Sequence, residues 1–112
     1  MYARNFRVKL KTDTSRNFLC VMANTVIPLL HNQDGFLDEV TFVAEDQSAA
    51  MTISFWDSTE HLSAFDQVAA SEVSRLLAGV VEGVPLVEVY EVVESNFYRM
   101  PVGGLQSREF LP

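Results

Sequence analysis

Apolar and polar residues alternate strictly near the start of the chain. In residues 5–11, NFRVKLK, one set of alternate positions is apolar and the other is basic apart from Asn5; the apolar set is Phe6, Val8 and Leu10. This period of two is typical of a β-strand that buries one face. We therefore expect the first strand over these residues.

A helical spacing follows this strand. Apolar residues recur three or four positions apart after the polar sequence TDTS, which offers helix N-caps. They are Phe18, Leu19, Met22, Val26, Leu29 and Leu30. Pro28 should bend the last turn because it lacks a backbone donor. The sequence HNQDG should then end the helix near Asn32.

Two further strands, a second helix and a last strand come next. FLDEVTFVA (36–44) and AAMTISFW (49–56) are joined by EDQS, which is short enough for an antiparallel hairpin. Residues 58–82 carry a helical apolar stripe with a predicted break near Ala70, and Gly83 is the expected cap. The β-branched segment PLVEVYEVV then predicts a last strand from Pro85.

This order of elements predicts an α+β fold of the ferredoxin-like βαββαβ kind, with two helices on one face of a four-stranded antiparallel sheet. We assign residues 1–94 to this domain and residues 95–112 to a C-terminal arm that packs on its own or a partner subunit. The residues expected to face the helices are Phe6, Val8, Leu10, Val40, Phe42, Met51, Ile53, Phe55, Val87 and Val89.

The opposite face of the sheet is expected to be partly apolar as well. This face should carry polar residues together with these apolar ones: Leu37, Val43, Trp56, Leu86, Tyr90 and Val92. Such a patch is larger than most soluble monomers expose. A homodimer packed sheet to sheet would cover it. The alternative is a solvated sheet face with a few surface hydrophobics.

Composition narrows the partners. A chain of 112 residues that is 48% hydrophobic suits one domain with a single core. Fifteen acidic against eight basic residues give a net charge of −7, so we expect neither nucleic acid nor a membrane surface as a partner. The single Cys20 cannot form an internal disulfide and no signal peptide is evident, which favours a cytoplasmic location.

Three segments carry a family resemblance: VIPLLHNQDGF (26–36), FWDSTEHLSAF (55–65) and EGVPLVEVYEV (82–92). With the element order, they resemble the antibiotic biosynthesis monooxygenase-like (ABM) domains of the dimeric α/β-barrel superfamily. The resemblance implies a homodimer whose sheets face each other, with a ligand pocket between sheet and helices in each subunit. Members include cofactor-independent monooxygenases of polycyclic aromatics and quinols, and haem-degrading enzymes. Fold alone does not choose among these activities.

The haem-degrading members use an asparagine on the first strand, a tryptophan on the second helix and a later histidine. Aligned on the FWDS junction, this chain resembles them poorly, because Phe6, Phe65 and Arg75 occupy those positions. Asn5 lies one residue away, which in a strand means the opposite face. We therefore expect no haem and no other cofactor.

Cofactor-free oxygenation requires an apolar pocket, a base and polar groups that support the resulting anion. His61 is the candidate base, because it lies in the first turn of a helix, where the helix dipole favours its neutral form. A surface histidine in a polar turn is the alternative interpretation. The candidate pocket residues are Met22, Asn24, Phe42, Phe55, Phe65 and Tyr90.

The acidic residues near His61 have a structural interpretation. Asp57 and Glu60 fit a capping box at the start of a helix, and two ligands such as Asp57 and His61 do not hold a zinc ion. No metal site is expected. Two functions stay open: a homodimer that binds a small apolar or aromatic molecule as a cofactor-independent monooxygenase, or a non-catalytic ligand-binding or scaffold dimer whose core is filled.

Overall fold

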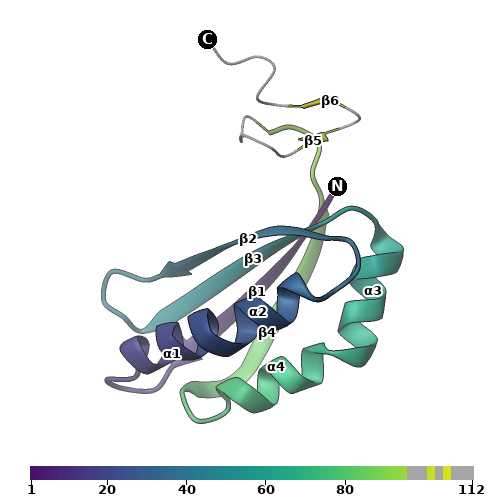
Figure 1. Cartoon of the computed structure of the whole chain (residues 1–112). Coiled ribbons are helices and arrows are strands. Elements are labelled where there is room, and N and C mark those ends of the chain that lie inside the picture. The colour runs from purple at the N-terminus through teal and green to yellow at the C-terminus, as the bar shows by residue number, and fades with distance from the viewer. Residues whose placement is uncertain (96–100, 103–104, 107–112) are drawn as a thin grey trace.

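Helices cover one face of a four-stranded antiparallel sheet (Figure 1). The structure is a computed structural model that describes residues 1–95, 101–102 and 105–106. Its elements are β1 (Tyr2–Leu10), α1 (Ser15–Val21), the π-helix η1 (Met22–Val26), α2 (Ile27–His31), β2 (Phe36–Val43), β3 (Ala49–Trp56), α3 (Thr59–Val68), α4 (Ala70–Leu77), β4 (Val81–Glu91), β5 (Pro101–Val102) and β6 (Leu105–Gln106). The strand order β2-β3-β1-β4 confirms the predicted α+β, ferredoxin-like fold.

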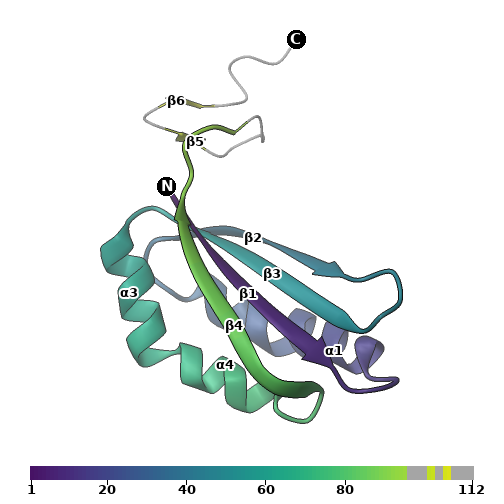
Figure 2. The same cartoon turned by 180° about the vertical axis from the view of Figure 1, so that it is seen from behind.

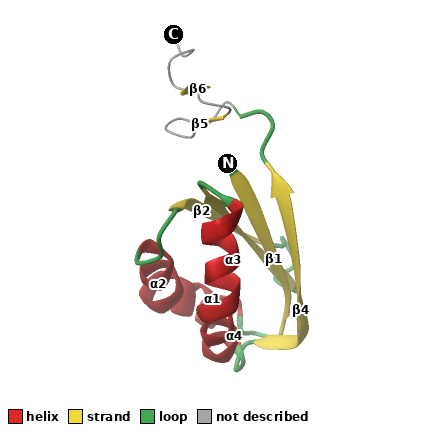
Figure 3. Ribbon diagram, turned by 90° about the vertical axis from the view of Figure 1, so that its right-hand side faces the viewer, coloured by secondary structure: helices red, strands yellow, loops and turns green. Residues whose placement is uncertain are grey.

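The molecule has two layers, which are seen edge-on in Figure 3. All the helices lie on one side of the sheet, and the view from behind shows a face that no helix of the described chain covers (Figure 2). We call this second face the outer face. It consists of the outward side chains of β1 to β4.

Strand β1 is central and decides which residues of its neighbours face the helices. Phe6 lies opposite Thr52 of β3 and Val87 of β4. Directly paired residues point to the same side of a sheet. Because Phe6 belongs to the main core, Thr52 and Val87 also face the helices. The predicted orientation of β1 is confirmed.

The predicted orientation of β2 and β3 is wrong. Strand β3 turns its more polar phase to the helices, and the apolar residues assigned to that side lie on the outer face; they are Val40, Phe42, Met51, Ile53 and Phe55. Trp56, expected on the outer face, is fully buried in the core. Its indole N–H donates to Ser54 Oγ at 2.9 Å.

The reason for this reversal lies in residue sizes and in satisfied hydroxyls. Both phases of β3 contain apolar residues, so alternation alone did not decide between them. Trp56 packs against Phe65 of α3 at a ring-centroid distance of 5.1 Å. The hydroxyls of Thr41 and Thr52 lie 3.1 Å apart and bond to each other, so these polar residues can face the core.

The first predicted helix is divided into three parts. Thr14 precedes α1 without capping it by a side-chain bond, and its hydroxyl donates instead to the Lys11 carbonyl at 2.6 Å. The wider turn η1 follows, and α2 contains Pro28 in its first turn. A proline ring crowds the carbonyl four residues earlier, here that of Asn24. The π turn includes Asn24 and accommodates the ring.

The second helical region breaks where predicted. Helices α3 and α4 meet at Ala69, whose φ of −112° departs from helical values. The region ends at Leu77, however, and β4 begins at Val81. Gly83 is therefore not a helix cap. It lies in β4 with φ +76°, where the pairing with β1 shifts register, so a bulge uses its conformational freedom.

Strands β5 and β6 pair with each other, and most of the predicted arm, residues 95–112, lies outside the described residues. Among the described residues, no helix is both long and apolar enough to cross a membrane.

Candidate functional site

A cavity lies between the sheet and the helices. Its walls come from β1, β3 and four helical segments, and the lining residues are Arg4, Phe6, Met22, Val26, Leu30, Thr52, Ser54, Phe65 and Val73. About 310 Å³ is free of atoms, including space at the mouth, but the centre of a water-sized sphere can occupy only about 20 Å³ of it. That is room for water rather than for an aromatic ring, so a larger ligand requires the walls to move.

Arg4 is the charged residue of this cavity. Its side chain is only 8% exposed, and its Nε donates to Asp66 Oδ1 of α3 at 2.7 Å. Its Cζ lies over the ring of Phe65 at 5.0 Å from the centroid and over that of Phe6 at 5.6 Å. Ion pairing and two cation–π contacts thus hold the guanidinium in place.

The π-helix η1 forms the opposite wall through Met22 and Val26. A π turn in a helix is uncommon and frequently marks a functional site. Methionine is flexible and fills irregular space. This wall is therefore the part of the cavity best suited to adjusting its shape.

The cavity unites some of the predicted pocket residues and excludes others. Met22 and Phe65 line it. Asn24 is exposed on η1 and is not part of the lining. Phe42, Phe55 and Tyr90 lie on the outer face, because the orientation of β2 and β3 differs from the predicted one and Tyr90 pairs with Ala3.

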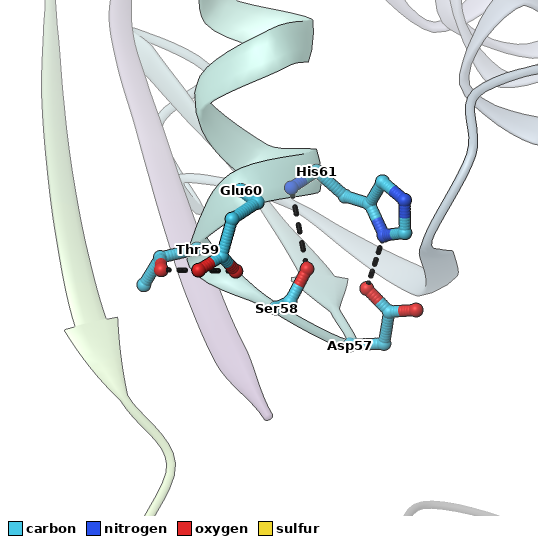
Figure 4. A network of polar contacts seen from close by, with 5 residues as sticks. All are labelled: Asp57, Ser58, Thr59, Glu60 and His61. Atoms are coloured by element: carbon cyan, nitrogen blue, oxygen red, sulfur yellow. Dashed lines mark hydrogen bonds and ion pairs between the residues drawn. The ribbon is translucent and has the colours of Figure 1, made fainter.

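His61 lies at the start of α3, away from this lining. Its side chain is 44% exposed, and its Nδ1 lies 2.7 Å from Asp57 Oδ1 (Figure 4). The hydrogen bond to Asp57 raises the pKa of His61, and the same bond lowers the pKa of Asp57. When neutral His61 donates its Nδ1 proton to Asp57, Nε2 keeps its lone pair, as a base requires. Its predicted catalytic role stays a prediction.

The predicted capping box of Asp57 and Glu60 is wrong, and the N-cap lies one residue later. Ser58 is the N-cap of α3, and its Oγ accepts from the His61 amide at 3.2 Å (Figure 4). Glu60 Oε2 instead accepts from the Thr59 hydroxyl at 3.4 Å. Serine competes with aspartate as an N-cap, and Asp57 pairs with His61.

Gly35 packs directly against the Asp57–His61 pair. Its carbonyl accepts from the Asp57 amide at 2.9 Å, and its φ is +80°. A Cβ atom here would overlap His61 Nδ1 and lie 2.5 Å from Asp57 Oδ1. The pair therefore joins the loop before β2 to the start of α3. No group of three or more metal-ligating side chains occurs in the described part of the chain.

Arg4 was missed by the sequence reasoning, although a signal for it exists. The predicted strand began at residue 5, whereas β1 begins at Tyr2. Extending the alternation backward from Phe6 places Arg4 on the buried face. A charged residue in phase with an apolar face is a marker of a functional or structural ion pair.

Comparison by sequence finds no matching family model and no matching curated protein. Comparison by structure finds many similar folds. A protein of Bordetella bronchiseptica, provisionally assigned as an antibiotic biosynthesis monooxygenase, has a TM-score of 0.72 at 14% identity, over 83% of this chain and 97% of its own. This chain shares the fold of that protein.

Two further structures show how varied the bound molecules of such folds are. A monooxygenase from the gene ActVA-Orf6 of Streptomyces coelicolor, in complex with nanaomycin D, has a TM-score of 0.69 at 14% identity, covering 80% of this chain and 84% of its own. A variant of MhuD with two manganese protoporphyrin IX molecules per active site has a TM-score of 0.67 at 17% identity, covering 85% and 97%. At such identities the likeness concerns the fold.

Proposed function

We propose that this chain binds a small, largely apolar or aromatic molecule between its sheet and its helices, as one subunit of a homodimer. The observation that carries this proposal is the cavity beneath the helices, which combines apolar walls with the buried guanidinium of Arg4. Ligand sites typically combine a mostly apolar lining with a few placed polar groups. The flexible wall formed by Met22 and η1 supplies a means of enlarging it.

The outer face supports the homodimer. Phe42, Leu86 and Tyr90 are 47%, 52% and 52% exposed there. Val40 and Ile53 lie beside them and are half-buried. The apolar phase of β3 thus faces away from the core, and a second copy packed against it would remove this surface from water.

Cofactor-independent oxygenation of the bound molecule is the activity that fits this proposal. The structural relative from Streptomyces coelicolor is a monooxygenase. Asp57 gives His61 the tautomer of a base. Because His61 does not line the cavity, its participation requires a substrate that extends from the cavity toward the start of α3.

A non-catalytic dimer is the second candidate, and one observation favours it. Only about 20 Å³ of the cavity admits the centre of a water-sized sphere, so its side chains nearly fill it. A protein of this kind would use the cavity for sensing a ligand or would use the fold as a scaffold.

Copurification separates the two functions. Mass spectrometry under native conditions should detect a small molecule bound to the purified protein, and an oxygen electrode should detect uptake with quinols. Uptake lost in His61→Ala and retained in His31→Ala would support catalysis with His61 as the base. Retention of a ligand without oxygen uptake would support the non-catalytic protein. No bound molecule and no uptake with any aromatic compound would contradict ligand binding.

The dimer has a separate test. Sedimentation should give twice the chain mass of 12.6 kDa. Phe42→Asp, on the outer face, should shift the protein toward the monomer. Val68→Asp is the matched control, because Val68 lies on α3 and is 78% exposed. A wild-type protein that sediments at 12.6 kDa at micromolar concentration would contradict the homodimer.

A further inference from the structure

We propose that Arg4 binds the carboxylate of the ligand, so that the cavity takes a small aromatic or branched apolar carboxylic acid in its ionised form. This inference rests on the proposed ligand-binding function and gives it a substrate class. It assigns the charged end of the ligand to β1 and the apolar end to the helical wall.

The hydrogen-bonding state of Arg4 is the first argument. More than nine-tenths of this residue is buried, and a guanidinium has five N–H donors. Among the described residues, its only hydrogen bond runs from Nε to Asp66 Oδ1, at 2.7 Å. Nη1 and Nη2 therefore lack a protein acceptor within that part of the chain. Asn5 Oδ1 is the one fully buried side-chain polar atom without a partner among the described residues, so the Nη atoms of Arg4 are not sealed off and can receive an acceptor in the cavity.

The geometry of the remaining donors selects the acceptor. Asp66 engages the Nε side, which leaves the end of the guanidinium with its two Nη atoms. Two parallel N–H groups at this end match the two oxygens of a carboxylate. The contacts of Cζ with the rings of Phe6 and Phe65 hold the guanidinium against turning away.

The neighbouring polar group is also a donor. Ser54 Oγ accepts from the indole N–H of Trp56, and its own hydroxyl hydrogen remains available. Ser54 lines the cavity together with Arg4. Thr52 also lines the cavity, but its hydroxyl hydrogen goes to Thr41, whose own goes to Glu39. Arg4 and Ser54 both offer hydrogens, which favours an anion over a cation or a neutral donor.

The rest of the lining requires an apolar body. The part of the cavity that the carboxylate would not fill is lined by apolar side chains, those of Phe65, Met22, Val26 and Leu30. A ring placed among them would displace Met22, whose side chain has several low-energy arrangements. The present space admits only water, so the body that Met22 makes room for should be small, such as a single ring or a branched aliphatic group.

Binding of matched aromatic probes tests this inference on the wild-type protein. Benzoate and benzamide have similar shapes but differ in charge. The fluorescence of Trp56 should change when either binds, because Trp56 packs on Phe65 of the cavity wall. We expect benzoate to bind at least tenfold more tightly than benzamide at pH 7. Higher salt should weaken benzoate binding alone.

Variants of β1 locate the anion site. Arg4→Met and Arg4→Lys should each reduce the preference for benzoate at least tenfold, because Lys lacks the fork. Arg7→Met is the matched control, since Arg7 is exposed on the outer face of the same strand. It should leave both affinities unchanged. Thermal unfolding of each variant shows that it is folded, and the wild-type comparison stands even if Arg4→Met does not fold.

Each outcome has a defined meaning. Equal binding of benzoate and benzamide by the wild type would overturn the role of Arg4 and leave ligand binding intact. The same follows if Arg4→Lys keeps the full preference for benzoate. Failure of benzoate, benzamide and toluene alike to bind would overturn both this inference and the proposed function.

Discussion

Removing Arg4 or Asp66 from their ion pair, one at a time, should lower the free energy of unfolding by unequal amounts. Asp66→Ala leaves a guanidinium whose side chain is 8% exposed without its anion. Arg4→Met leaves a carboxylate whose side chain is 36% exposed and can be hydrated. The stranded charge is therefore much more deeply buried in the first variant than in the second.

The magnitudes follow from this difference in exposure. Leaving a fully buried charge unpaired costs about 3–5 kcal/mol, and the partial exposure of Asp66 reduces the original strength of the pair. We expect the free energy of unfolding to fall by about 2–3 kcal/mol in Asp66→Ala. In Arg4→Met it should fall by about 1 kcal/mol, mainly through lost cation–π contacts.

Urea unfolding followed by the fluorescence of Trp56 measures both values. The two variants and the wild type must be compared at one protein concentration, because dimerisation would stabilise the folded state by mass action. Similar slopes of free energy against urea would show that the comparison is valid. Arg4→Met costing as much as Asp66→Ala, or more, would refute the reasoning from burial.

Three further predictions concern the start of α3 and the core. Gly35→Ala should destabilise the fold by about 1–3 kcal/mol, because the φ of Gly35 is +80° and an added Cβ would press on Asp57 and His61. Gly79→Ala is the control in the same urea assay. It should be near neutral, because an added Cβ there meets no atom within 4 Å. Asp57→Asn should lower the pKa of His61 measured by NMR titration, whereas an unchanged pKa would contradict the bond between them. Ser54→Ala should lower the free energy of unfolding by about 1–3 kcal/mol, since the indole N–H of the only tryptophan loses its acceptor. An unchanged urea midpoint would contradict this and show that water replaces the hydroxyl.

The pH dependence of the Asp57–His61 pair has a defined sign. The pKa of His61 is raised in the folded state, so its contribution to stability is complete below its ordinary pKa of about 6.5 and is lost as pH rises through the folded pKa. The pKa of Asp57 is lowered in the folded state, so its contribution to stability is complete above its ordinary pKa and is lost as pH falls through the folded pKa. The pair therefore stabilises most between the ordinary pKa values of the two groups, about 3.8 for Asp57 and about 6.5 for His61.

The fold could be predicted because its elements differ in period along the sequence. The alternation of β1 and the glycine, proline and polar residues between elements gave the element order. The orientation of β3 could not be predicted, since Ala50 and Trp56 on one phase compete with Met51, Ile53 and Phe55 on the other. Only the pairing with β1 and the packing of Trp56 decide between them.

The candidate site was harder to predict for a related reason. Of the six pocket residues proposed, Met22 and Phe65 belong to helical apolar stripes and line the cavity, whereas Asn24 lies off its stripe and is exposed. For pocket residues on strands, the prediction depends on which alternate side chains of the strand face the helices. The orientation of β2 and β3 is the reverse of the predicted one, so Phe42 and Phe55 lie on the outer face. Arg4 escaped notice because the strand begins earlier than its clearest alternation.

The π turn also resolves an angular problem in the first helical region. Four residues of this region, each four positions after the last, are all buried: Phe18, Met22, Val26 and Leu30. In a continuous α-helix, each such step rotates the side chain by ~40°, so Leu30 would point ~120° away from Phe18. The wider turn at Met22–Val26 takes up this rotation and keeps the four in one line. A π turn holds one residue more than an α turn. Deleting one residue there should therefore leave a plain α-helix in which Leu30 stays within ~20° of Phe18, because eleven residues make about three turns.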